Sequence, residues 1–537
     1  MVDARRGIGI AAVLAAFAAL VAYPLARLAG TLGERGPEAI GRAIAGVGGR
    51  AVVTSLGLAL AVATLAVALG TAAALVGERA SPRGRWLVRA TMVGSLLVPP
   101  FVSALGWAAA FGPRGLMDKA FGISLPGMYG LPGLVLVLAM EAVPIAYLVI
   151  AAVLAGRDEA DLERAARASG ATAARALRDI TLPLLRRPIL GAVVLVFVMT
   201  LNAFGVPAVL GIPAGISTIT TRLYQDLAFS ADPASFDRAV VLAMILVGLA
   251  FVTVASADRL LGGADVDRPA VTSNSRTPSG GRSGIAVGIV LGVVAVAVVV
   301  PFVALVLVAI TRAVGLPPTP EHWTLDNIAQ VLDRRSIGAL LRSIGLAFAA
   351  ATVVTLLAGL VVAVGRRAGR LLGTVVAVGF AVPGSTLALA VLIGYGGALR
   401  DTLALILVAY LGKFWALGQR PIAGAVDRLP GDLLRAARAS GARPRAVLAT
   451  IVVPLLRPAI AGAWLIVFLF GLHEVTMSSL LYGPGTDTLA VVTLNIQQLG
   501  DPTVTAALAV VLTVVVLLAA IPVLLVRRAA DRPLGRE

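Results

Sequence analysis

The sequence predicts an all-α membrane protein with twelve transmembrane helices, arranged as two parallel six-helix repeats. Three observations carry this prediction. Hydrophobic residues make up 59% of the 537 and charged residues only 14%, which is unlike a soluble protein. Apolar runs of about eighteen residues or more recur, each long enough to cross a bilayer as a helix. The octapeptide Arg-Ala-Ala-Arg-Ala-Ser-Gly-Ala occurs at 164–171 and again at 435–442, which indicates an internal duplication.

The predicted spans follow from the apolar runs. They lie near 8–28, 51–76, 88–111, 131–155, 188–211, 239–257, 284–311, 343–365, 371–397, 402–420, 458–482 and 504–527. Those at 188–211 and 458–482 are candidates for broken rather than continuous helices. The first run follows Arg5 and Arg6 but lacks a small-residue cleavage site, so we expect an anchor and not a removed signal peptide.

The net charge of +17 could indicate nucleic acid, but its distribution favours a membrane topology instead. With the N-terminus inside, 31 of the 45 Lys and Arg fall on the inner side and 13 on the outer side, while Lys413 lies within a span. This is the positive-inside pattern. We therefore expect both termini and both octapeptides in the cytoplasm, a multi-pass protein of the plasma (inner) membrane with the lipid bilayer as its surroundings, and no nucleic-acid partner.

Three regions are predicted along the chain. Residues 1–257 form the first six-helix repeat and residues 284–537 the second. Between them, 258–283 is rich in Ser, Pro and Gly and reads as a flexible cytoplasmic linker. Because six spans is an even number, both repeats enter the membrane from the same side and are related by an axis along the membrane normal.

Each octapeptide belongs to a short amphipathic helix. Residues at i, i+3, i+4 and i+7 form one face, namely Leu162, Ala165, Ala166 and Ser169 in the first copy and Leu433, Ala436, Ala437 and Ser440 in the second. Asp161 and Asp432 are the predicted N-caps. Gly170 and Gly441 supply the turn past the helix end.

A second short helix is predicted after each glycine. It carries Ile180 in the first copy and Ile451 in the second. Pro183 and Pro454 are expected to close or kink it. Each unit would thus be two short helices bent at a glycine, with a small-residue face that admits a partner closely.

This unit resembles the EAA loop of bacterial ABC-importer permeases, whose pattern is Glu-Ala-Ala, three residues, Gly, nine residues and Ile-x-Leu-Pro. The matching residues are Ala165, Ala166, Gly170, Ile180, Leu182 and Pro183, and then Ala436, Ala437, Gly441, Ile451 and Pro454. Two departures stand out, because Arg164 and Arg435 replace the glutamate and Val453 replaces the leucine in the second copy. The resemblance implies that 157–187 and 428–457 are coupling loops that dock on ATPase subunits. The alternative is a pair of amphipathic surface helices left by duplication.

Helix breaks at matching depths indicate a transport path. Pro99-Pro100 lies in the third span and Pro383-Gly384 in the ninth, and interrupted segments at corresponding positions of two halves typify such paths. Ordinary proline kinks are the competing interpretation. Asn202 and His473 also correspond, at the same offset of 271 residues that separates Arg164 from Arg435.

Charges inside the spans are further path candidates. Glu141 and Lys413 fall at nearly equivalent sites of the two halves, and Glu474 follows His473. Ionised groups at membrane depth are costly unless they are paired or face water. Two interpretations compete: the side chains reach toward the nearer interface, or Glu141 and Lys413 form an ion pair between the halves.

The sequence offers no catalytic or metal-binding constellation. Gly412-Lys413 is followed by Phe414 and lies in a span, so it is not a phosphate-binding loop. The chain has no cysteine, and its two histidines, His322 and His473, are far apart. We therefore expect no catalytic residue, no metal site and no cofactor, with ATP hydrolysis carried out by a separate subunit.

The resemblance implies a fused, two-half permease of the type I ABC importer fold. Its implied partners are two ATP-binding subunits in the cytoplasm and an extracytoplasmic solute-binding protein. The segments 202–207 and 474–485 resemble ferric-iron permeases most, while thiamine and phosphonate permeases are similar. A twelve-helix secondary transporter without ATPase partners remains the runner-up, and a membrane scaffold without transport is a third reading that leaves the matched breaks unexplained.

Overall fold

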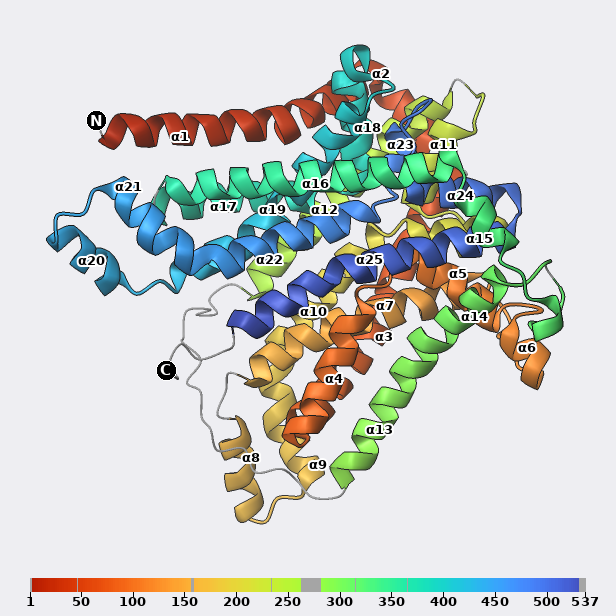
Figure 1. Ribbon diagram of the computed structural model, residues 1–537, viewed down its shortest axis with the longest axis horizontal. Coiled ribbons are helices and arrows are strands. Elements are labelled where there is room, and N and C mark those ends of the chain that lie inside the picture. Colours follow the sequence, from red (N-terminus) through yellow and green to blue (C-terminus); the bar gives the residue numbers. More distant parts are fainter. Residues whose placement is uncertain are drawn as a thin grey trace.

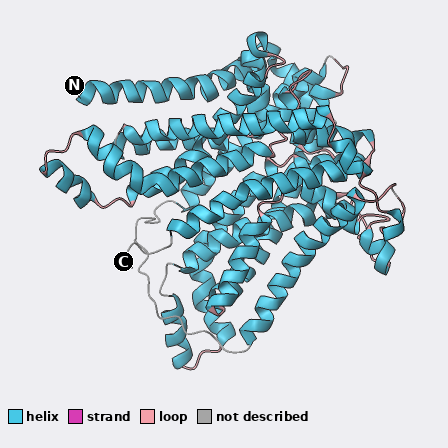
Figure 2. Cartoon of the chain, in the orientation of Figure 1, coloured by secondary structure: helices cyan, strands magenta, loops and turns pink. Residues whose placement is uncertain are grey.

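The computed structural model describes residues 2–45, 47–155, 159–232, 234–261, 282–313, 315–364 and 366–530. Helices joined by short loops make up these ranges, as Figure 2 shows. The β-structure within them is one isolated bridge between Thr311 and Trp323. The predicted all-α class is therefore confirmed. We refer to the described residues of 2–261 as the first half and those of 282–530 as the second half.

The first half holds twelve α-helices, three π turns and one 3₁₀ turn in its described residues. They are α1 (Val2–Phe17), η1 (Ala18–Ala22), α2 (Tyr23–Ile44), α3 (Val47–Arg79), α4 (Pro82–Ser95), α5 (Pro100–Phe111), α6 (Leu116–Phe121), α7 (Leu131–Ala155), α8 (Glu159–Ala168), α9 (Ala173–Ala176), η2 (Leu177–Thr181), α10 (Leu182–Leu201), η3 (Pro207–Gly211), η4 (Ile212–Ala214), α11 (Ile219–Ala228) and α12 (Ala234–Leu261).

The second half repeats much of this order. Its elements are α13 (Arg282–Val294), η5 (Ala295–Val299), α14 (Val300–Ala309), η6 (Pro320–His322), α15 (Asp326–Val331), α16 (Arg334–Ala363), α17 (Arg366–Ala381), α18 (Gly384–Leu399), α19 (Leu403–Asp427), α20 (Gly431–Ala439), α21 (Pro444–Val447), η7 (Leu448–Val452), α22 (Val453–Leu472), α23 (Ser478–Leu481), α24 (Leu489–Leu499) and α25 (Pro502–Ala530).

Eleven of the twelve predicted spans pass a test of length and apolar composition in the described residues. Nine are single helices and two are bent helix pairs. The twelfth predicted span, 402–420, is also a helix, α19. It is not among the eleven apolar spans, and it carries the polar residues Lys413, Gln419 and Arg420. The two spans predicted as candidates for breaks do break, because α10 ends at Leu201 and α22 ends at Leu472.

Both bent pairs lie at the prolines that the sequence marks. The chain turns by 99° between α4 and the segment that starts with α5, and by 96° between α17 and α18. Pro99 and Pro383 each occupy the N-cap of the following helix in extended backbone. Proline cannot donate the main-chain hydrogen bond that would continue the preceding helix, so the helix ends before it and a new one begins after it. These bends are sharp breaks between two helices and not gentle kinks within one.

The helix that opens each half packs on the other half. In the first half, α2 contacts α18; in the second half, α14 contacts α5 (Figure 1). Glycine permits both crossings: a Cβ built on Gly106 would lie 2.9 Å from the main-chain oxygen of Pro301, and one on Gly394 would lie 3.3 Å from the ring of Tyr23. The halves are thus held together by an exchange of their first helices.

The remaining contacts repeat between halves. Helix α3 packs on α7 and α10, and α16 packs on α19 and α22. The hydroxyl of Ser55 on α3 accepts a hydrogen bond from the main-chain N–H of Ile219 at 2.8 Å, and that of Ser343 on α16 accepts one from Leu489 at 2.9 Å. Ile219 and Leu489 are both the first residue of a short helix. These matched bonds confirm the duplication independently of the octapeptide.

The bounds near the predicted linker differ from the prediction. Helix α12 runs on to Leu261 and α13 begins at Arg282, so both helices extend into 258–283. The predicted span ends at 257 because the apolar run ends there. The helix itself continues for four more residues, which a hydropathy pattern does not register. Most of the predicted linker lies outside the described residues.

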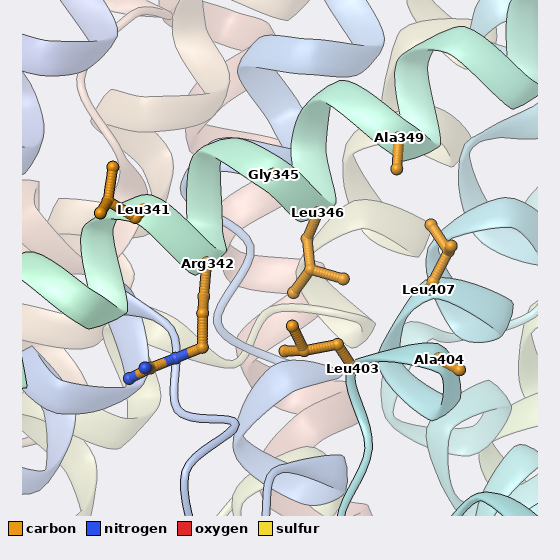
Figure 3. Close-up of a pocket in the computed structure, with 8 residues that line it drawn as sticks. All are labelled: Leu341, Arg342, Gly345, Leu346, Ala349, Leu403, Ala404 and Leu407. Carbon is orange, nitrogen blue, oxygen red and sulfur yellow. The ribbon is translucent and has the colours of Figure 1, made fainter.

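An open groove runs along the outer face of α16 and α19. It is lined by Leu341, Arg342, Gly345, Leu346, Ala349, Leu403, Ala404 and Leu407. Leu346 and Leu403 point toward one another across it (Figure 3). Its wall is apolar apart from Arg342, and it includes none of the predicted path residues. The groove therefore does not belong to the candidate path.

Candidate functional site

The two octapeptides form equivalent helices at the same end of the molecule. Helices α8 and α20 lie toward one end of the bundle, and α6, α11, α15 and α24 lie toward the other (Figure 1). Gly170 and Gly441 follow them with φ of +92° and +73°. Such values favour glycine because a Cβ in this region meets the neighbouring carbonyl. The predicted glycine turn is thus observed in both copies.

The predicted N-caps are displaced. Helix α8 begins at Glu159 and α20 at Gly431, so Asp161 and Asp432 stand inside the first turn and not at the cap. The charge of Asp432 still lies at the favourable end of the helix dipole. Asp432 also forms an ion pair with Arg435, three residues on. The side chains of Asp161 and Arg164 lie outside the described residues.

The second helix of each unit is not short. Residues Ala173–Leu201 form one continuous helix, and Leu448–Leu472 likewise continue into the membrane. A π turn precedes each proline, at Leu177–Thr181 and at Leu448–Val452. Because a π turn shifts the main-chain bonding pattern locally, the helix passes Pro183 and Pro454 without ending. The prediction that these prolines close a short helix is therefore wrong.

The small-residue helices present leucine to solvent. Leu162 is 53% exposed and Leu433 is 46% exposed. On the same helices, the hydroxyls of Ser169 and Ser440 each donate to the main-chain oxygen four residues earlier at 3.0 Å, so neither serine offers its proton to a partner. The exposed face is consequently apolar and narrow, which suits a groove on another protein.

The break in the first half lies beside a buried carboxyl group. Glu141 on α7 has Ser103 of α5 as its hydrogen-bond partner. Its Oε1 atom is buried and makes no hydrogen bond with the described residues. Ser103 lies in the first turn of α5, where its N–H donates to Pro99. The carboxyl group thus faces the N-terminal end of the helix after the break, which favours negative charge.

The break in the second half lies beside a buried amine. The Nζ of Lys413 on α19 donates to the main-chain oxygens of Phe380 at 3.0 Å and Val382 at 2.7 Å. It also lies 4.9 Å from the centre of the Phe380 ring. These carbonyls end α17, where no further turn supplies N–H partners. Lys413 therefore stays at the break instead of reaching toward an interface.

Glu141 and Lys413 do not form the predicted pair. Each is bonded within its own half, Glu141 to Ser103 and Lys413 to Phe380 and Val382. The ion-pair hypothesis is thus not met in this conformation. The 271-residue offset relates Glu141 to position 412, one residue before Lys413. Successive residues on a helix point about 100° apart, so the two side chains leave their helices in different directions.

The ends of α10 and α22 carry the predicted pair Asn202 and His473. Both are the residue at which the span stops. The amide of Asn202 donates to Val198 at 2.7 Å, and the ring of His473 interacts with the main-chain oxygen of Leu469, the equivalent residue. Asn202 Oδ1 and His473 Nδ1 are buried without a partner among the described residues. The two positions therefore place an unpaired polar atom at matched sites.

Glu474 caps the short helix α23. Its carboxylate accepts from the main-chain N–H groups of Met477 at 2.9 Å and Ser478 at 3.0 Å. Glu474 also interacts electrostatically with Lys413. The hydroxyls of Tyr410 and Ser478 are 2.7 Å apart. One network thus joins α17, α19 and α23 around the second break.

Two aspartate–arginine clusters at the end of the bundle opposite α8 and α20 could not be predicted in full from the sequence. Asp226 forms ion pairs with Arg222 at 2.7 Å and Arg238 at 2.6 Å, and its side chain is fully buried. Asp487 pairs with Arg342 at 2.5 Å and Arg335 at 3.4 Å. The i,i+4 spacing of Arg222 and Asp226 was a readable signal. The other pairs join residues far apart in sequence and had none.

No metal site is formed in the part of the chain that the structure describes, where no three acidic or histidine side chains come together. The candidate site consists instead of two helix breaks with buried ionisable groups beside them, and of the two exposed octapeptide helices at one end.

Comparison with known proteins identifies the family. Residues 66–257 and 351–535 each match the binding-protein-dependent transport system inner membrane component. The chain belongs to this family and contains its domain twice. It is therefore a multi-pass protein of the inner membrane, and the fused, two-half architecture is confirmed.

Relatives within the family are named for different solutes. The chain is 24% identical over 438 residues to the Fe(3+)-transport system permease protein FbpB 2 of Haemophilus influenzae, covering 79% of this chain and 80% of that protein. It is 34% identical over 186 residues to a probable molybdenum ABC transporter permease of Haloferax volcanii (34% and 66%). It is 29% identical over 186 residues to the thiamine transport system permease protein ThiP of Brucella melitensis (34% and 33%).

Proposed function

We propose that this chain is the complete transmembrane pathway of an ABC importer, working with two ATP-binding subunits and an extracytoplasmic binding protein. One observation carries the proposal: a family domain present twice, with an equivalent exposed helix and left-handed glycine turn in each copy. A self-sufficient carrier has no use for two such helices. The 157–187 and 428–457 segments are the proposed coupling loops, with both termini on the same, cytoplasmic side.

The transport cycle follows from the way these loops join the membrane helices. Because α9 and η2 continue into α10, a force on α8 passes along a rigid helix to Asn202. The same holds for α20, α22 and His473. ATP binding that closes two docked ATPase subunits would draw α8 and α20 together and rock the halves about the exchanged helices α2 and α14. The ATPase thus shifts a two-state equilibrium by binding one arrangement better.

The first coupling loop has an anchor of its own. Glu163 on α8 forms an ion pair of 2.9 Å with Arg79 at the end of α3. This pair joins the loop to a second span in addition to α10. The exposed leucines beside it, Leu162 and its counterpart Leu433, are the apolar contacts offered to the ATPase subunits.

Ferric iron is the solute we propose. The relative matched over most of both chains is named for Fe(3+) transport, whereas the thiamine relative matches over about a third of each chain. A 2-aminoethylphosphonate permease matches over 37% of this chain. The buried polar atoms of Asn202, Glu141 and His473 suit a cation in passage more than an apolar solute.

Uptake in living cells tests this proposal. Deletion of the gene should abolish high-affinity uptake of radiolabelled ferric iron, and plasmid-borne protein should restore it. Thiamine and 2-aminoethylphosphonate uptake, measured in parallel, should not change. Loss of thiamine uptake with intact iron uptake would transfer the assignment to thiamine. Iron uptake that survives ATP depletion under a maintained proton gradient would favour a secondary transporter.

A further inference from the structure

The second half carries a device that the first half lacks. At the break before Pro383, the last carbonyls of α17 are bonded by the ammonium of Lys413 at 3.0 Å and 2.7 Å. Short main-chain turns occur at both breaks, since Leu96, Leu97 and Val98 donate three residues back at the first and Val382 donates to Gly379 at the second; the lysine contact is found at the second. The residue equivalent to Lys413 by the 271-residue offset is Ala142.

Lys413 belongs to a larger arrangement that spans three helices. Tyr410 lies three residues before it on α19, so both face the same side. Tyr410 reaches Ser478, and Glu474 caps the α23 turn that contains Ser478. The same turn touches the break directly, since a Cβ built on Gly384 would lie 3.6 Å from the side chain of Met477.

The charge of each side chain is opposite to the partial charge of the helix end that it contacts. The end of α17 presents carbonyls and attracts a cation, while the start of α23 presents N–H groups and attracts an anion. Lys413 and Glu474 supply these charges and also interact with each other. In a membrane, carbonyls at a broken helix have no water to bond them. The ammonium therefore replaces the hydration that the break would need.

We propose that Lys413 is a positioning residue for translocation, which fixes the break between α17 and α18 against the α22–α23 turn. The second break then moves as one body with the end of α22.

Spin-label distances on the full chain in lipid nanodiscs test this directly. The natural chain contains no cysteine, so introduced cysteines are the only label sites. The exposed pair Leu371→Cys and Ala398→Cys reports the angle across the second break. The pair Leu87→Cys and Phe121→Cys reports the first break. All four positions are exposed.

Lys413→Met should shift and broaden the distance distribution of the second pair and leave the first pair unchanged. Lys413→Arg should retain the original narrow peak, because a guanidinium donates to the same carbonyls. Arg420→Met is the matched control: Arg420 also lies over the Phe380 ring, at 5.9 Å, and should have no effect on either pair.

Three results would overturn the proposal: an unchanged second pair in Lys413→Met, equal disturbance by Lys413→Arg, or an equal effect of Arg420→Met. If Lys413→Met does not fold, Lys413→Gln takes its place, because glutamine keeps a hydrogen-bond donor without the charge. The distance distribution of the second pair should then be broader than in the natural chain. A Lys413→Gln distribution identical to that of the natural chain would then overturn the role of the charge.

Uptake provides the functional arm, which rests on the proposed function. Lys413→Met should lower the maximal rate of ferric-iron uptake and leave the half-saturating concentration unchanged, because the binding protein sets the latter. Lys413→Arg should restore the rate. If the natural chain itself shows no iron uptake, the proposed solute fails, while the label distances still decide the role of Lys413. A changed half-saturating concentration at an unchanged maximal rate would contradict a positioning role.

Discussion

The two halves share a backbone plan but differ in how each break is charged. In the first half, an acid, Glu141, lies at the start of the helix after the break. In the second, a base, Lys413, lies at the end of the helix before it. Each charge suits the helix end that it faces. Both halves thus keep a sharp helix break at this position, but the side chain that lies beside it is an acid in one half and a base in the other.

The ends of the two halves opposite α8 and α20 also satisfy a similar geometry with different residues. Asp226 and Asp487 each receive two arginines, yet they do not correspond along the chain. Asp226 lies inside α11, whereas Asp487 precedes α24. Each half thus has a carboxylate bound by two arginines at this end, at positions that do not correspond along the chain. The predictions below use such pairs, and the largest expected effect comes first.

Asp226→Asn should destabilise the protein more than Asp487→Asn. Removing one partner of a buried ion pair leaves an uncompensated charge and costs about 3–5 kcal/mol. The side chain of Asp226 is fully buried, whereas that of Asp487 is 10% exposed and one of its arginines is 67% exposed. Thermal unfolding of the purified variants would show this order. Equal losses in unfolding temperature would mean that the two clusters are equivalent despite their different burial.

The turns at Gly170 and Gly441, after α8 and α20, allow the two halves to be compared at the opposite end of the bundle. Gly170→Val and Gly441→Val each force a branched side chain into a left-handed backbone, at a cost of roughly 1–2 kcal/mol at that residue. Nothing lies within 4 Å of a Cβ at either site, so the membrane domain should stay folded while coupling fails. ATP hydrolysis stimulated by the binding protein in proteoliposomes should fall in both single variants. Full stimulation in the double variant would contradict a coupling role.

Much of this architecture could be predicted because it depends on local patterns. The spans follow from apolar runs, the breaks from Pro99 and Pro383, and the turns from Gly170 and Gly441. The continuous helix through Pro183 could not be predicted, because the π turn that accommodates the proline depends on the whole span remaining helical in the membrane. The exchange of first helices was also unreadable, since Gly106 and Pro301 meet only in space.

The side-chain network was predicted in part. Glu141, Lys413, Asn202, His473 and Glu474 were singled out as polar groups in apolar runs. The structure places Asn202 and His473 at the ends of their own helices, and Glu141, Lys413 and Glu474 beside the ends of other helices. Their partners were not predicted, because main-chain atoms such as the oxygens of Phe380 and Val382 carry no sequence signal. Sequence position alone can indicate that a charge needs a partner, but only the fold determines which partner it finds.

Two serines test where the halves should behave alike. Ser55→Ala and Ser343→Ala each leave a buried main-chain N–H without its acceptor, at Ile219 and Leu489. Each loss should cost about 1–3 kcal/mol. Because the bond lengths and surroundings match, the two variants should lower the unfolding temperature equally, and the double variant should show the sum. A large difference between the single variants would show that the repeat is less symmetric than its contacts.

The smallest expected effect is the coupling between Glu141 and Lys413, and it decides whether the charges of the two halves act separately. Each is bonded inside its own half, so Glu141→Gln and Lys413→Met should have additive effects on unfolding temperature. An interaction beyond about 0.5 kcal/mol, the usual limit for independent sites, would mean that the residues meet in another conformation of the cycle. The same three variants assayed for coupled ATP hydrolysis extend the test, because turnover visits conformations that a static sample does not. Additive stability with non-additive turnover would place their contact in a transient state. Additivity in both assays would establish that Glu141 and Lys413 act separately, each at the break of its own half.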